Sequence, residues 1–226
     1  LSRVIQPEWV KQCVGRVGTW AGRRLVSCDV ADMGDDDTVM YGWTGPRLTD
    51  AQVYGKVPAI QTAANVVTFA QTLGADLIVM DATGLGAPVV ERVQELIGSR
   101  LIQVVGVNMA SKANKPEFRN MRAEVWWEAG QALQESEASL PNDPYLLAEL
   151  SAPVYAIRHG KIQLQDKDEV KRELGRSPDK GDACVLGLWA YRTLPPTAIE
   201  DPWLKETSTQ RAIRHREEET VSAGSG

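Results

Sequence analysis

Two short apolar runs, each followed by an aspartate, constrain the fold of this chain more than any other feature. Asp29 follows the run that begins at Leu25, and Asp81 follows the run that begins at Leu77. Runs of this length, bounded by polar residues, are typical of buried strands. A carboxylate at the end of a strand lies at an edge of the sheet, where ligands bind in α/β folds. We therefore expect both aspartates at one sheet edge.

A third aspartate, Asp182, lies in the segment 177–183, which begins an apolar helix. Carboxylates gathered at one point repel one another unless a cation neutralises them. Hard oxygen ligands, in a chain with only 2 histidines, favour Mg²⁺ or Mn²⁺ over zinc. The three positions therefore indicate metal-assisted phosphoryl chemistry.

The composition is ordinary for a globular domain, with 226 residues, 43% of them hydrophobic and 24% charged. No apolar run approaches the roughly 20 residues of a membrane span, and no signal peptide is visible. The 3 cysteines lack CxxC spacing and indicate free thiols in a reducing compartment. The net charge of −5 argues against non-specific DNA binding by the whole surface. Because the first residue is leucine, we expect a piece of a longer chain.

Hydrophobic periodicity predicts a three-stranded meander followed by alternating helices and strands. A short helix is expected after Pro7, and a turn at 32–36. The remaining elements are expected as follows: strands at 23–30, 37–44 and 48–56, a helix at 59–73, a strand at 76–81, a helix at 87–97, a strand at 101–107, helices at 118–135 and 143–151, a hairpin at 153–165 that turns at His159–Gly160, and a last helix, capped by Ser177, that runs to about 193.

Three motifs add to this order. They are Asp29–Thr38, Met80–Val89 and Lys171–Ala183. In sequence and in order they resemble the nuclease motifs of viral large terminases, the DNA-packaging motors of tailed phages. That family implies an α/β, ribonuclease H-like fold, in which a mixed central sheet (an antiparallel meander plus parallel strands) is flanked by helices. The resemblance also implies three parts: an arm or linker at 1–19, the nuclease at 20–194, and a tail at 195–226 that is at least partly disordered.

The resemblance implies a metal-dependent endonuclease that cuts double-stranded viral DNA concatemers during packaging. Two Mg²⁺ or Mn²⁺ ions are expected, with Asp29 between them and Asp81 and Asp182 each completing one ion's ligands. Asp179, one helical turn before Asp182, is a second candidate for the third ligand. Basic residues near the acids are expected to contact DNA phosphates: Arg158, Lys161, Arg172, Arg176 and Lys180.

The family also implies partners and a location. The expected partners are double-stranded DNA, the packaging ATPase domain of the full-length chain, the small terminase subunit and the portal protein. The expected location is the host cytoplasm at the procapsid. No Walker A pattern occurs, so we expect the ATPase to lie outside this sequence.

Other interpretations remain open. A junction resolvase or another ribonuclease H-like nuclease fits the same acids, and a catalytically idle DNA-binding or docking module fits the same scaffold. Asp37 is the best auxiliary acid, although turn acids are common. Gly84 and Gly86 favour a tight turn beside the metal site over a nucleotide-binding loop. The pair Trp126–Trp127 favours core packing over base stacking, and His159 favours a solvated hairpin tip.

Overall fold

The computed structural model describes residues 2–31, 36–98 and 100–195. Its central feature is a five-stranded sheet with the strand order β4-β3-β2-β5-β6. The strands, in chain order, are β2 (Arg24–Asp29), β3 (Asp37–Thr44), β4 (Arg47–Gly55), β5 (Leu77–Asp81) and β6 (Gln103–Val107). The predicted turn at 32–36 lies largely outside the described residues, as does the predicted tail.

The pairing of these strands is mixed. β2, β3 and β4 form an antiparallel meander, whereas β5 pairs in parallel with both β2 and β6. A meander needs only short turns, whereas parallel neighbours need a crossover connection, which the helices after β4 and β5 supply. The predicted mixed sheet is confirmed.

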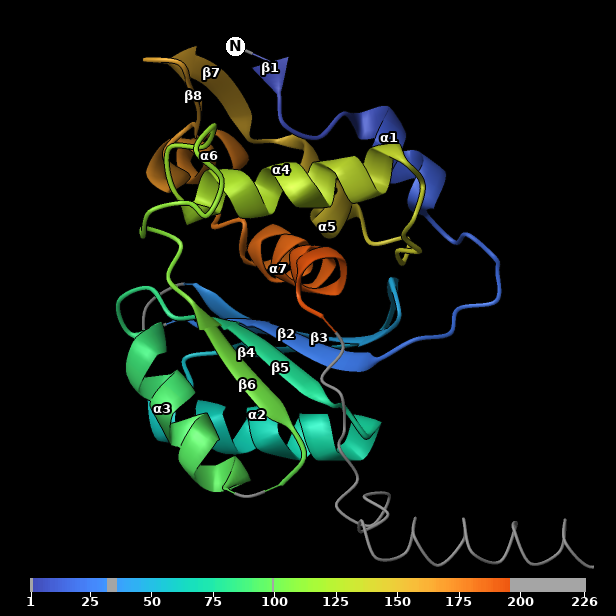
Figure 1. The fold of residues 1–226 in the computed structure, drawn as a ribbon, viewed down its shortest axis with the longest axis vertical. Coiled ribbons are helices and arrows are strands. Elements are labelled where there is room, and N and C mark those ends of the chain that lie inside the picture. The colour runs from blue at the N-terminus through green and yellow to red at the C-terminus, as the bar shows by residue number, and fades with distance from the viewer. Residues whose placement is uncertain (1, 32–35, 99, 196–226) are drawn as a thin grey trace, which may run out of the picture. The chain divides into compact units, whose positions relative to one another are not determined.

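Helices cover both faces of the sheet (Figure 1). α2 (Ala59–Leu73) and α3 (Gly86–Ile97) pack on one face, and α7 (Asp179–Thr193) packs on the other. Because side chains alternate along a strand, β2 contributes Val26 and Cys28 to the core under α2 and α3, and Leu25 to the core under α7. α4 (Met121–Gln134), α5 (Pro144–Ser151) and α1 (Pro7–Cys13) form the layer beyond α7.

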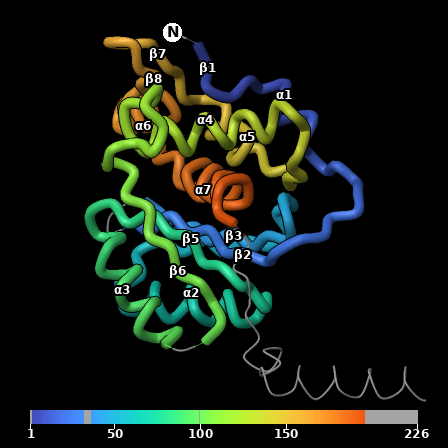
Figure 2. The backbone as a smooth tube through the Cα atoms, in the orientation of Figure 1, coloured from blue at the N-terminus to red at the C-terminus, as the bar shows by residue number. Residues whose placement is uncertain are grey.

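A second, three-stranded sheet has the order β1-β7-β8. β1 (Ser2–Arg3) pairs with β7 (Val154–Arg158), which pairs with β8 (Lys161–Leu164). Figure 2 shows the start of the chain running beside this hairpin before it turns into α1. Ile5 and Val10 are fully buried, so the segment that enters the domain belongs to its core.

Two local expectations need correction. A short helix, α6 (Lys167–Leu174), was not predicted, because its eight residues are mostly charged and bury only Val170. Ser177 is not the cap of α7: the residue before the helix is Pro178, and no side chain caps it locally. Within the described residues, no helix combines the length and the apolar character that crossing a membrane requires.

Candidate active site

Two of the predicted acids come from the ends of neighbouring strands. Cys28 of β2 lies beside Met80 of β5 in the parallel register, so Asp29 and Asp81 leave the sheet at the same edge. Asp29 is only 5% exposed. The Oδ1 atom of Asp81 accepts a hydrogen bond of 2.8 Å from the Thr83 backbone N–H, which fixes this carboxylate against its own turn.

The turn after Asp81 needs glycine for two different reasons. Gly84 has a φ of +56°, which is in the left-handed region. Gly86, at the start of α3, lies so close to β5 that a Cβ atom would stand 2.0 Å from the Asp81 carbonyl oxygen. The tight turn expected from the sequence is present, and it presses the helix against the residue that carries the second carboxylate.

Gly86→Ala is therefore expected to lower the free energy of unfolding by about 1–3 kcal/mol or more, because the new methyl group must push backbone away. Urea unfolding of the purified domain measures this change. Gly84→Asn is the matched control, since nothing lies within 4 Å of its Cβ position and asparagine tolerates this φ. Equal losses in the two variants would contradict the close approach at Gly86.

The helix α7 brings the remaining acids. Asp179 and Asp182 are separated by one turn and are 8% and 5% exposed. Asp179 accepts a hydrogen bond of 2.9 Å from the Asp37 backbone N–H at the start of β3. Asp37 thus contributes its main chain to the site by holding Asp179, and the side chain of Asp37 is exposed.

A glutamate on another helix, α5, binds the first turn of α7. Glu149 of α5 is 2% exposed and accepts a hydrogen bond of 2.9 Å from the Gly181 N–H. The same carboxylate accepts a bond of 2.9 Å from Arg176 Nε. Glu149 thus satisfies one of the free N–H groups that a helix start leaves, the role that the sequence analysis gave to Ser177.

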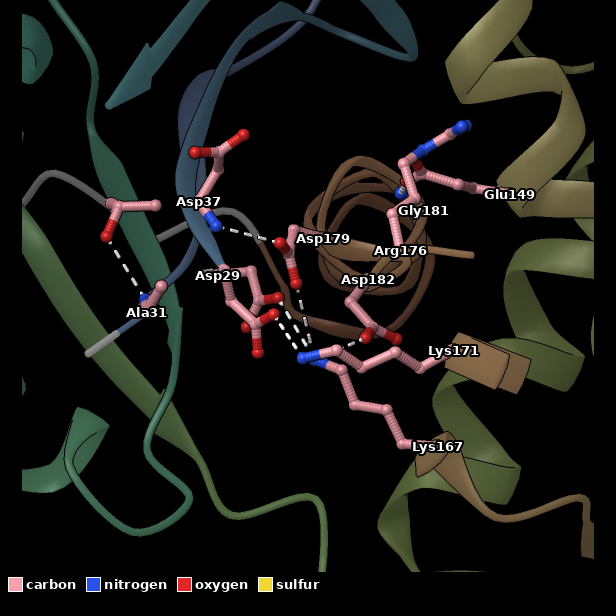
Figure 3. A network of polar contacts seen from close by, with 12 residues as sticks. Asp29, Ala31, Asp37, Glu149, Lys167, Lys171, Arg176, Asp179, Gly181 and Asp182 are labelled. Atoms are coloured by element: carbon pink, nitrogen blue, oxygen red, sulfur yellow. Dashed lines mark hydrogen bonds and ion pairs between the residues drawn. The ribbon is translucent and has the colours of Figure 1, made fainter. Parts of the chain in front are cut away.

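The Lys167 ammonium lies among the carboxylates. Its Nζ atom is 2.8 Å from Asp182 Oδ2, 3.4 Å from Asp29 Oδ2 and 3.8 Å from Asp179 Oδ1. Figure 3 draws these three contacts as dashed lines at the end of the Lys167 side chain. Sequence reasoning missed Lys167, because a lysine in a short charged segment looks like any solvated surface residue.

The close approach of the aspartates and Lys167 shifts the pKa values of these groups. Burial raises the pKa of Asp29 well above its usual value, and the charges of the other acids add to that rise while Lys167 opposes it. Burial also acts to raise the pKa of Asp182, but Lys167 and Arg122 outweigh it and hold this pKa below its usual value. Burial raises the pKa values of Asp81 and Asp179. The site thus gathers carboxylates whose ionised forms are unfavourable together unless a cation lies among them.

The donor set suits a hard divalent cation, because it consists of carboxylate oxygens alone. A cation of the chain itself, the Lys167 ammonium, is already surrounded by three of them. With the side chains as they stand, the described residues contain no group of three or more His, Cys, Asp or Glu arranged to hold a metal ion. The chemistry of the site fits a metal, and the Lys167 ammonium contacts three of the carboxylates that would hold it.

The five basic residues proposed for DNA contact differ in their surroundings. Arg176 pairs with Glu149 and lies over the Tyr145 ring, and Lys180 pairs with Asp143. Both also line a cavity of about 460 Å³ that reaches Asp179. The other three, Arg158, Lys161 and Arg172, are on the β7–β8 hairpin and on α6.

The geometry of the site can be compared with known proteins. No family model matches the sequence, and no curated protein matches it significantly. Solved structures do match. The nuclease domain of the large terminase subunit gp2 of bacterial virus Sf6 has a TM-score of 0.71 at 19% identity, covering 83% of this chain and 98% of that chain.

The chain has the fold of phage large-terminase nucleases. A mutant of the Sf6 domain with manganese and beta-thujaplicinol has a TM-score of 0.72 at 19% identity, with the same coverage of both chains. The large terminase nuclease from thermophilic phage G20c with bound magnesium has a TM-score of 0.62 at 14% identity, covering 85% of this chain and 98% of that chain. The terminase-nuclease, ribonuclease H-like fold predicted from the three motifs is confirmed.

Proposed function

We propose that this terminase-like domain is a metal-dependent endonuclease that cleaves double-stranded viral DNA concatemers during genome packaging. The observation that carries the proposal is the convergence of four aspartates, Asp29, Asp81, Asp179 and Asp182, at one edge of the sheet. All of them except Asp81 contact the Lys167 ammonium. Metal-bound structures of two terminase nucleases with this fold support a magnesium or manganese cofactor.

In this proposal, Asp29, Asp81 and Asp182 would hold two divalent ions, which would supply activation of the attacking water and stabilisation of the leaving oxygen of the phosphodiester. Asp29 would lie between the ions, because it ends the central strand β2, which pairs with the strand of Asp81 and packs against the helix of Asp182. Asp81 would hold one side and Asp182 the other. Asp179 is 3.8 Å from Lys167 Nζ, against 2.8 Å for Asp182, so Asp182 remains the stronger candidate and Asp179 an additional one.

Lys167 has a defined part in the proposal. Its ammonium neutralises the buried acids when no divalent ion is bound, and it must move aside for the same oxygens to hold an ion. Because Asp182 Oδ2 and Asp29 Oδ2 both contact it, Lys167 holds these carboxylates close to each other. Its charge lowers the pKa of Asp182 and opposes the rise in the pKa of Asp29.

A plasmid-nicking assay with Mn²⁺, Mg²⁺ or EDTA tests the function. Linearised or nicked plasmid should accumulate only with a divalent ion. Product that forms equally well in EDTA, or a domain that never cuts, would overturn the proposal. A four-way junction compared with linear duplex of the same sequence separates a packaging nuclease from a junction resolvase, which would strongly prefer the junction.

The biological setting is part of the same proposal. The packaging ATPase domain of the full-length chain would deliver the double-stranded DNA that the nuclease cuts. The small terminase subunit and the portal protein would be further partners, and the reaction would take place at the procapsid in the host cytoplasm. The fold shared with phage terminase nucleases supports this setting.

DNA affinity is expected to be weak and sensitive to salt, because the chain carries a net charge of −5. Arg158→Ala/Lys161→Ala should reduce the slope of log affinity against log salt by about two, roughly one for each lost phosphate contact. Arg92→Ala, which breaks an exposed pair with Glu95 on α3, is the control and should leave the slope unchanged.

Arg176→Ala should behave differently. It leaves the buried Glu149 carboxylate without its cation, so its main effect should be a lower melting temperature.

Fluorescence anisotropy of labelled duplex between low and moderate salt measures the slope of log affinity against log salt for each variant. An unchanged slope in Arg158→Ala/Lys161→Ala would remove the hairpin from the DNA-binding surface.

A further inference from the structure

The indole of Trp126 reaches the third catalytic acid from the core. Trp126 lies in α4 and has no exposed surface. Its Nε1–H donates a hydrogen bond of 3.0 Å to Asp182 Oδ1. The other oxygen of this carboxylate, Oδ2, faces Lys167 at 2.8 Å. The two oxygens of Asp182 therefore have separate partners, one in the core and one in the site.

This division matters because the terminal torsion of an aspartate side chain is broad and roughly two-fold. A hydrogen bond to a charged acceptor is stronger than one between neutral groups, so it selects one orientation. The indole also packs against the first turn of α7: a Cβ atom at Gly181 would lie 3.3 Å from the Trp126 ring. Trp126 therefore constrains both the carboxylate and the backbone that carries it.

We propose that Trp126 is a positioning residue of the nuclease, which engages Asp182 Oδ1 so that Oδ2 is presented to the cation. The inference rests on the proposed function, and it adds a residue from a helix that contributes no acid to the site. Trp126 acts through Asp182 and makes no contact with substrate.

Trp189 provides the contrast within the same core. It lies on α7, two turns beyond Asp182, and is 5% exposed. Among the described residues, its indole N–H has no hydrogen-bond partner. This core therefore buries an indole without supplying a carboxylate, so the bond at Trp126 is not a general requirement of packing tryptophan here.

The test compares Trp126→Phe with Trp189→Phe, which remove the same atoms from one core. The two readouts are the Mn²⁺ concentration that half-saturates cleavage and the rise in melting temperature that Mn²⁺ produces. Trp126→Phe should raise the half-saturating concentration about 10-fold or more and diminish the thermal response, as is typical when a partner of a ligand is lost. Trp189→Phe should leave both unchanged.

A benzothienylalanine at position 126 separates the loss of the hydrogen bond from a folding defect, because it keeps the shape of the indole but has no N–H. It should match Trp126→Phe in its metal response. In an Asp182→Ala background, Trp126→Phe should cause no further loss of the thermal response. A further loss there, or equal shifts in the Trp126 and Trp189 variants, would overturn the positioning role.

The same data separate the inference from the proposed function. A wild-type domain that responds thermally to Mn²⁺ but cuts no DNA, together with a weakened response in Trp126→Phe, refutes the nuclease and keeps the positioning role. Normal metal-dependent cleavage that Trp126→Phe leaves unaltered refutes the positioning role and keeps the nuclease. A wild type with no response to Mn²⁺ overturns both.

Discussion

Asp29→Asn is expected to reduce metal-dependent cleavage by about 100-fold or more, while the fold remains intact. The amide has nearly the same volume as the carboxylate but lacks the charge that would hold the ions. A metal ion supplies several kcal/mol of charge stabilisation to the transition state, and each 1.36 kcal/mol changes the rate tenfold. Initial nicking rates at saturating Mn²⁺ measure the loss.

The same substitution should leave the metal-free melting temperature equal or higher at neutral pH. Burial raises the pKa of Asp29 well above its usual value, despite the opposing Lys167 charge. A carboxyl group with a raised pKa in the folded state costs no stability below its ordinary pKa, and the cost grows as the pH rises through the raised pKa. Asparagine removes this cost, so the advantage of the variant should grow from acidic to neutral pH.

Melting curves in EDTA from acidic to neutral pH check whether Asp29→Asn raises the melting temperature and whether the rise grows with pH. Asp50→Asn is a suitable control, because Asp50 is an exposed acid on β4, away from the site. An Asp29→Asn domain that cuts at close to the wild-type rate would refute the role of Asp29 as a metal ligand. One that melts far below the wild type at neutral pH would refute the electrostatic account of the site.

Lys167→Ala should make the stability of the domain depend on divalent metal. Without metal, three buried acids lose their shared cation, at an expected cost of about 1–3 kcal/mol. This is less than for a fully buried pair, because the Lys167 side chain retains 39% exposure. With Mn²⁺, the ion replaces the lost charge, so the rise in melting temperature on adding metal should exceed that of the wild type.

The pH dependence of this effect follows from both partners. Burial acts to lower the pKa of Lys167, but the charges of Asp182 and Asp29 raise it above its usual value, so the ammonium stays charged throughout the neutral range. The loss in Lys167→Ala should therefore be largest at neutral pH and shrink in acid, where the carboxylates become protonated.

Lys171→Ala is the matched control, one turn further along α6. Lys171 pairs with Asp36, both partly exposed, and such pairs contribute at most about 1 kcal/mol. If the two lysine variants respond equally to Mn²⁺, or if Lys167→Ala loses the same stability with and without metal, the ammonium and the metal do not share a position.

The backbone of the site was largely predictable from the sequence. β3 and α2 begin and end at the predicted residues, and the strand ends at Asp29 and Asp81 follow from the apolar runs before them. The strands are buried along nearly their whole length and α2 repeats a helical apolar pattern, so local sequence and burial agree. The helix start near Asp182 was found for the same reason, although its cap was assigned to the wrong residue.

The partners of the acids were not predictable in the same way. Lys167, Glu149 and Trp126 each meet the first turn of α7 or its acids from another helix, more than ten residues away in the chain. A lysine in a charged segment, a glutamate on a short helix and a tryptophan in an apolar run look ordinary along the sequence. Only the packing of α4, α5 and α6 around α7 shows their roles.

The contrast between β2 and α6 has a consequence for motion. Asp29 ends the middle strand of the sheet, whose backbone is paired on both sides, whereas Lys167 begins an eight-residue helix that buries only Val170. Segments with so little buried surface open locally at a small fraction of the global unfolding free energy. Amide hydrogen exchange should therefore be slow along β2 and fast along α6. We therefore expect α6 to open locally while β2 stays folded, so that the Lys167 ammonium leaves the site and Asp29 remains in place.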